Sequence, residues 1–187
     1  FQVYTHMNFR ACGIIRPLLS FVMLMAVIPA LFGQSRKIDS LARVASNSGD
    51  LEVRISAMNA LALELIPVDI NRATEVAVEA VEEAEKSDND DLLAWALIGQ
   101  AVCFQTEGNI IRAEHILERV LKLNQKIKSQ SVDGYATNLV GNGYRDKGRF
   151  DSAYFHYRRA WRVMEREKDP LFPLVYHLEL GRFFNVL

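Results

Sequence analysis

Residues 138–154, NLVGNGYRDKGRFDSAY, place three glycines, two arginines and a lysine within one short segment. Glycine-rich turns with basic side chains bind phosphate when the turn joins a strand to a helix. No strand-like stretch precedes this segment, and it lacks the Lys-Ser/Thr ending of a P-loop. Asp146 also stands where G-x-G-x-x-G requires its last glycine. We therefore interpret these glycines as structural.

The acidic and histidine residues form no recognisable metal-binding or catalytic pattern. The acidic run at 88–91 does not fit a calcium loop, because Leu93 and Gly99 occupy the positions that require glycine and glutamate. The histidines beyond the N-terminal segment are scattered singly, with no second ligand four residues away: His115, His156 and His177. No local nucleophile motif is present. We expect no metal, no cofactor and no enzymatic activity within this chain.

The composition is that of a globular protein. The chain has 187 residues, of which 50% are hydrophobic and 24% charged, and its formal net charge is -1. This length suits one ordinary domain or a short repeat array. No basic stripe stands out, so we expect no nucleic-acid partner.

Residues 1–33 have the composition of a secretory signal peptide. They contain two arginines and no acidic residue, and residues 18–32 form an apolar run shorter than the roughly 20 residues of a membrane-spanning helix. A basic region begins at Met7, so residues 1–6 can be upstream translation or a fragment edge. We expect an exported protein, periplasmic or on the extracytoplasmic face of the membrane. An uncleaved N-terminal anchor is the alternative.

The two cysteines cannot form a disulfide in a processed chain. Cys12 lies in the predicted signal peptide, which leaves Cys103 alone. Cys103 stands among apolar residues in IGQAVCF, where we expect it to act as a small buried hydrophobic residue.

Beyond residue 33 the apolar residues follow a helical period, and the sequence repeats itself. GNIIRAEHILERV begins at Gly108 and GRFDSAYFHYRRA at Gly148, forty residues later. Small or apolar residues recur at this offset in the first helix of each copy, at Leu61, Ala101, Gly141 and Gly181, and bulky residues follow at Phe104, Tyr144 and Phe184. In the second helix the recurring residues are Ala73, Ala113 and Ala153, then Ala80, Val120 and Ala160.

This recurrence has a packing reason. Antiparallel helices approach closely only where side chains are small, so Gly141 should lie against Ala153, with Gly148 in the turn between their helices. Each pair exposes an apolar face that the next pair covers. We therefore predict an all-α fold, a right-handed superhelical solenoid of antiparallel helix pairs with a period of forty residues.

The predicted organisation is a lead helix at 34–48, followed by repeats at 50–88, 90–128 and 130–169 and a truncated repeat at 170–187. The expected helices span about 35–47, 50–66, 70–86, 90–107, 110–127, 131–147, 150–168 and 171–187.

The repeats resemble the tetratricopeptide repeat family. The third copy carries the pattern at Asn138, Gly141, Asn142, Tyr144, Gly148, Phe150, Ala153, Tyr157 and Ala160. The second keeps Ala101, Phe104, Gly108, Ala113, Leu117 and Val120. The first has Pro67 and Val68 in place of the turn glycine, and the spacing exceeds the usual period of about 34 residues, which implies longer helices.

The resemblance implies that the first helix of each pair lines a concave groove that binds a protein or peptide. The groove residues it indicates are Trp95, Gln105, Tyr135, Asn138, Asn142, Arg145 and Arg182. Asn138, Asn142 and Arg145 share one helix face, where they could hold a peptide backbone or a carboxylate. Alternatively, the asparagines only bridge neighbouring repeats and the arginines are solvated.

Residues 170–187 look like the first helix of a further repeat, so we expect the chain to be a fragment of a longer protein. A signal peptide followed by long repeats resembles the exported sensory region of bacterial signalling proteins, in which such an array precedes a membrane helix and a histidine kinase or DNA-binding domain. The chain would meet a membrane only through an uncleaved signal or such a downstream helix. A free exported adaptor and a repeat region attached to a missing catalytic domain are the alternatives.

Overall fold

A computed structural model describes residues 34–167 and 177–181. The predicted signal peptide and most of the predicted last helix lie outside these residues. The chain divides into two compact units, residues 1–40 and 41–187. In the first unit the described residues, 34–40, are helical, and the features from Leu41 onward belong to the second unit.

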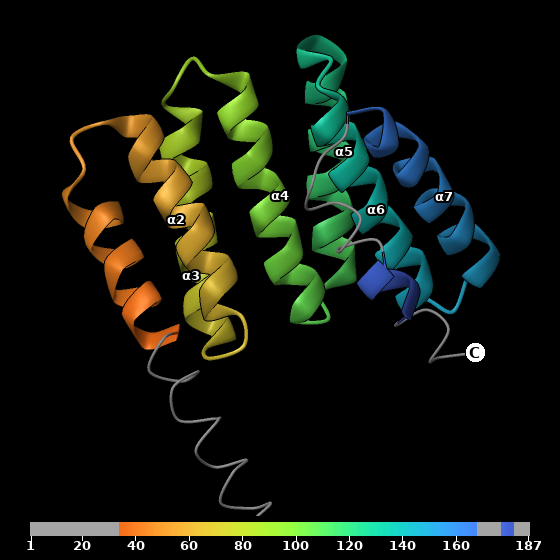
Figure 1. Cartoon of the computed structure of the whole chain (residues 1–187), viewed down its shortest axis with the longest axis horizontal. Helices are drawn as coiled ribbons and strands as arrows, with labels where there is room; N and C mark the ends of the chain where they lie inside the picture. Colours follow the sequence, from red (N-terminus) through yellow and green to blue (C-terminus); the bar gives the residue numbers. More distant parts are fainter. Residues whose placement is uncertain (1–33, 168–176, 182–187) are drawn as a thin grey trace, which may run out of the picture. The chain divides into compact units, whose positions relative to one another are not determined.

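The described part of the chain is all helical and contains no strand, which confirms the predicted all-α class. Residues 34–47 are helical, as predicted for the lead helix. The following helices are α2 (Leu51–Leu65), α3 (Ile70–Glu85), α4 (Asp90–Thr106), α5 (Ile110–Ile127), α6 (Gln130–Asp146) and α7 (Phe150–Glu167) (Figure 1). Each of their ends lies within one residue of the predicted end. Residues 177–181, inside the predicted last helix, are also helical.

Local signals fix the ends of these helices. The side chains of five N-cap residues accept hydrogen bonds from the first-turn N–H groups: Asp50, Asp69, Asn89, Asn109 and Ser129. Gly108 and Gly148 end the turns after α4 and α6 with φ of 79° and 70°. Glycine adopts this left-handed conformation at little cost, which explains the recurrence of glycine forty residues apart.

Helices that follow one another in sequence pack as antiparallel neighbours from α2 to α7 (Figure 1). In addition, α4 contacts both α2 and α6, whereas among the described helices α3 does not reach α5 and α5 does not reach α7. The helices therefore form two layers. The first-helix layer, which we define as α2, α4 and α6, is continuous, and α3, α5 and α7 stand further apart from one another.

The recurring small residues lie where the helices approach each other. Ala73, Ala113 and Ala153 are fully buried, as are Ala80, Val120 and Ala160. Ala101 is also fully buried, and Phe104 is largely so. A Cβ atom on Gly141 would stand 2.7 Å from the ring of Tyr157 and 3.3 Å from the carbonyl oxygen of Ala153. Gly141 therefore lies against Ala153 as predicted, and Tyr144 packs beside the same cluster.

Gly181 differs from the other small positions. The described residues leave open space where its Cβ atom would be, so the close approach predicted there is not seen.

Polar contacts between repeats recur at the same offset as the sequence. Thr74 of α3 donates a hydrogen bond to Glu107 after α4, and forty residues later Lys147 after α6 pairs with Glu114 of α5. The pairs occupy equivalent positions although the residue types differ. The three-dimensional arrangement therefore repeats with the forty-residue period seen in the sequence.

Candidate functional site

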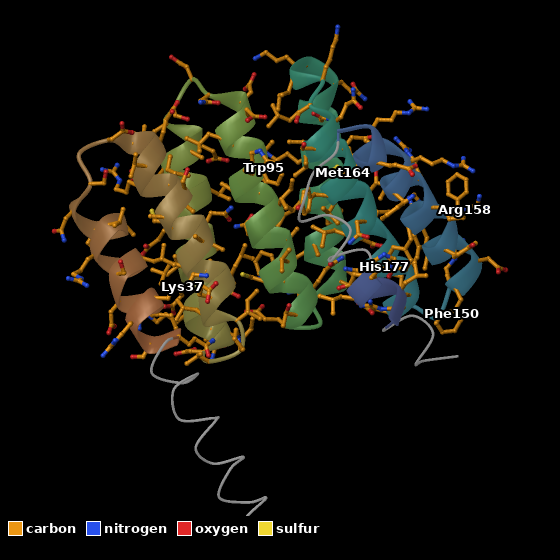
Figure 2. The ribbon with its side chains drawn as sticks, in the orientation of Figure 1. Lys37, Trp95, Phe150, Arg158, Met164 and His177 are labelled. Carbon is orange, nitrogen blue, oxygen red and sulfur yellow. The ribbon has the colours of Figure 1, made fainter. Side chains whose placement is uncertain are left out.

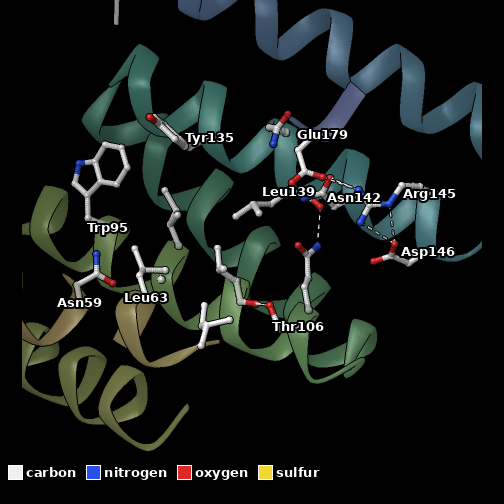
Figure 3. Close-up of a pocket in the computed structure, with 16 residues that line it drawn as sticks. Asn59, Leu63, Trp95, Thr106, Tyr135, Leu139, Asn142, Arg145, Asp146 and Glu179 are labelled. Atoms are coloured by element: carbon white, nitrogen blue, oxygen red, sulfur yellow. Dashed lines mark hydrogen bonds and ion pairs between the residues drawn. The ribbon is translucent and has the colours of Figure 1, made fainter. Parts of the chain in front are cut away.

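The first-helix layer carries a cavity of about 510 Å³, shown in Figure 3. The residues that line it come from α2, α4 and α6, from the ends of these helices and from residue 179, and none comes from α3, α5 or α7 among the described residues. Of the seven predicted groove residues, six line this cavity: Trp95, Gln105, Tyr135, Asn138, Asn142 and Arg145. The seventh, Arg182, lies outside the described residues.

The sequence interpretation missed part of the lining. Asn59, Leu63 and Ile66 belong to the first copy, whose pattern is degenerate, and Glu179 belongs to the last. The forty-residue offset was the signal that could have found Asn59, because it relates Asn59 to Gly99 in the same lining.

One wall of the cavity is aromatic. Trp95 of α4 and Tyr135 of α6 occupy equivalent positions forty residues apart, and their rings meet edge to face with centroids 5.4 Å apart. Apolar side chains continue the wall: Leu63, Ile98, Val102 and Leu139. Such a surface favours contact with an apolar side chain of a ligand.

Two amide oxygens in the lining have no donor. Within the described residues, the Oδ1 atoms of Asn59 and Asn138 are buried and accept no hydrogen bond. Asn138 is only 2% exposed, and the amide of Asn59 lies over Gly99, where a Cβ atom would stand 1.8 Å from its oxygen. A buried acceptor without a donor costs free energy, so a ligand N–H group that reached either oxygen would recover it.

Asn142 has a structural partner. Its Oδ1 accepts a hydrogen bond from the hydroxyl group of Tyr157 at 2.8 Å and another from Nη1 of Arg145 at 3.3 Å. Burial raises the pKa of Tyr157 well above its usual range, so its hydroxyl stays protonated and donates. Asn142 thus joins α6 to α7 of the same repeat.

Arg145 is also engaged within the molecule. Its Nη1 donates to the Glu179 carboxylate at 2.6 Å and its Nε to the Asp146 carboxylate at 2.9 Å. The side chains of Arg145 and Glu179 are only 14% and 11% exposed. Burial alone would lower the pKa of Arg145, but Tyr157, Asp146 and Glu179 raise it overall, so the guanidinium is charged and compensated. It has little capacity left for a ligand carboxylate.

Gln105 is the counterpart of Arg145 one repeat earlier. Its Nε2 donates to the carbonyl oxygen of Leu139 at 2.7 Å, and Leu139 is equivalent to Glu179 forty residues later. Both side chains therefore connect one first helix to the next. This bridging role was expected as an alternative for the asparagines, and the structure places it at Gln105 and Arg145 instead.

The remaining reactive side chains lie apart from the cavity. Cys103 is fully buried, and burial, with the nearby Glu107 carboxylate, raises the pKa of its thiol to about 11. His156 stacks on Tyr144 with centroids 5.1 Å apart, and burial lowers its pKa. Over 34–167 and 177–181 no group of His, Cys, Asp or Glu side chains is arranged to hold a metal ion.

The fold and site define an all-helical protein of repeated helix hairpins with a cavity on one layer. The chain is similar to BtubC (BKLC) from P. vanneervenii, whose crystal structure matches with a TM-score of 0.56 at 18% sequence identity. The match covers 72% of this chain and 55% of BtubC, so this chain spans about half the length of that protein. At this identity the similarity concerns the fold alone. No family model and no curated protein matches the chain.

No helix in the described part of the chain is both long enough and apolar enough to cross a membrane.

Proposed function

We propose that this chain is a solenoid of tetratricopeptide-like repeats that binds a protein or peptide segment in the cavity of its first-helix layer. Its role is binding rather than catalysis. The groove prediction from the repeat register and the lining of the cavity coincide at six residues. The contacts of α4 with both α2 and α6 make this layer continuous, as the inner layer of the proposed right-handed superhelix would be.

The observation that carries the proposal is the pair of unpartnered amide oxygens beside an aromatic wall. Asn138 is a polar side chain in a place where an apolar one would be more stable, and such residues are kept at functional sites. The acceptors suit backbone N–H groups of an extended segment, and Trp95 with Tyr135 suits one of its apolar side chains. Because Arg145 is compensated, a peptide backbone is a better ligand than a free carboxylate.

We further propose that the binding region is exported and belongs to the extracytoplasmic sensory or scaffolding part of a bacterial signalling protein. The support is the composition of residues 1–33, which has basic and apolar residues without an acidic one, followed by long repeats.

The binding proposal can be tested with a phage-displayed library of random linear peptides selected on the full chain. We expect enriched peptides to share an apolar anchor residue. Trp95→Ala should weaken their binding by about tenfold or more, because a buried aromatic anchor contributes about 2 kcal/mol or more. The readout is the dissociation constant by isothermal titration calorimetry.

Asn138→Leu separates a binding role from a structural one. Replacing a buried, unpartnered amide by an apolar side chain of similar size should leave stability unchanged or raise it, while peptide binding weakens. Phe155→Ala, an exposed aromatic residue on α7, serves as the control that should bind normally. If no peptide is enriched, or if the enriched peptides bind all of these variants equally, the proposal is wrong.

A further inference from the structure

The outward face of α7 is strongly basic and partly aromatic. We define the α7 face as Phe155, Arg158, Arg159, Arg162 and Arg166, which lie on one side of the helix. These residues are exposed, and Phe155 is 64% exposed. The sequence shows no basic stripe, but the helical period gathers these arginines on one side of α7, together with the exposed acidic residues Asp151 and Glu165.

The arginines of this face are largely uncompensated within the molecule. Arg159 forms one ion pair, with Asp133 at 3.4 Å. Arg158 lies over the ring of Tyr154, 5.8 Å from its centroid, and Figure 2 shows Arg158 on the outer side of α7. Among the described residues Arg162 and Arg166 have no ion-pair partner. These four arginines line a shallow hollow of about 540 Å³, and the rest of its lining is Asp151, Tyr154, Phe155 and Val163.

The equivalent face of α3 is mainly acidic, although Lys86 stands at the position equivalent to Arg166. We define the α3 face as Glu75, Val78, Glu79 and Glu82, which stand eighty residues before the corresponding positions of α7. The three glutamates are exposed, and Val78 between them is half-buried. Glu75 and Glu79 have no ion-pair partner within the described residues. Glu79 and Glu82 on α3 correspond to Arg159 and Arg162 on α7, so the charge is reversed at these two positions.

We propose that the α7 face docks on the α3 face of a second copy of this chain. The charges are complementary, and each face sets an apolar residue, Phe155 or Val78, among its charges. If the two helices met in antiparallel orientation, Arg158, Arg162 and Arg166 would each lie beside a glutamate. The reason is that, on both faces, these charged residues follow one another about one helical turn apart. Charge complementarity of this kind fixes partner and register.

The contact joins two different surfaces, so a pair of bound copies still offers one free face of each kind. Such a heterologous contact allows further copies to add. Association should therefore grow with protein concentration, and it should weaken as salt screens the charges, from about 0.01 M to about 1 M ionic strength.

The test is sedimentation velocity of the full chain at low and high salt, with charge-reversal variants on each face. Arg158→Glu with Arg162→Glu makes both faces acidic, and Glu79→Arg with Glu82→Arg makes both basic, so each double variant should associate at least about tenfold more weakly than the natural chain. An equimolar mixture of the two should associate again, because basic and acidic faces then meet. The mixture also shows that both variants are folded.

Lys122→Glu with Lys128→Glu is the matched control, since it changes the net charge as much as the α7 variant does but lies on α5 and its C-cap. This control should retain the association. Three results would overturn the proposal: a natural chain that stays monomeric at low salt, equal association in all variants, or a mixture that associates no better than its separate components.

Discussion

At the scale of single residues, Gly141 and Gly143 have opposite surroundings although they lie two residues apart on α6. A Cβ atom on Gly141 would stand 2.7 Å from the ring of Tyr157. A Cβ atom on Gly143 would meet nothing closer than 3.7 Å. Only the first glycine is required by the close approach of α6 and α7.

Gly141→Ala should therefore destabilise the fold by about 1–3 kcal/mol, the usual cost of overpacking a buried contact. Gly143→Ala is the control, and it should be neutral or stabilising by about 0.5–1 kcal/mol, because alanine favours the helix more than glycine does. Urea unfolding followed by circular dichroism measures both. Equal effects of the two substitutions would show that the helices do not approach at Gly141.

The sequence could predict which residues face the cavity but not how they are used there. The repeat register places Trp95, Tyr135 and Asn138 on one layer, because register alone decides which side of a helix a residue occupies. The partners of Gln105 and Arg145 depend on the distance between first helices, which no local pattern encodes. Asn59 was missed for a related reason, since the first copy has lost most of the pattern that marks the register.

At the scale of elements, local signals were sufficient for the helices and most turns. Asparagine, aspartate and serine caps mark the starts, and Gly108 and Gly148 mark the ends. The turn after α2 forms without glycine, since the N–H groups of Val68 and Asp69 both donate to the carbonyl oxygen of Leu65. This alternative turn explains why the first copy keeps its helices while departing from the sequence pattern.

The ion pair between Arg145 and Glu179 holds residues 177–181 against α6, and its removal should loosen them. Glu179→Gln removes one of the two carboxylates that pair with a largely buried guanidinium, so we expect amide exchange in 177–181 to become about tenfold faster, which corresponds to about 1.4 kcal/mol. Hydrogen exchange with mass spectrometry measures the rates. Leu178→Gln, at an exposed neighbouring residue, is the control that should change little. Equal exchange in the Glu179 variant and the natural chain would show that the pair does not hold this segment.

At the scale of the whole second unit, the two layers carry different surfaces. The first-helix layer has a cavity with an aromatic wall and unpartnered acceptors, whereas the opposite layer has charged faces that change from acidic on α3 to basic on α7. Peptide binding in the cavity and self-association through the charged faces are therefore independent, and each can fail without the other.

The central claim is that the first-helix layer binds a peptide segment, and the two tryptophans allow a direct test. Trp95 lies in the cavity and Trp161 on α7, where its ring is 5.9 Å from that of His177. The measurement is a titration of the ¹⁵N-labelled chain with a selected peptide, followed through the two indole N–H resonances in NMR spectra. We expect the Trp95 resonance to shift with saturation while the Trp161 resonance stays in place. A shift of Trp161 with Trp95 unchanged would contradict the assignment of the binding site to this layer.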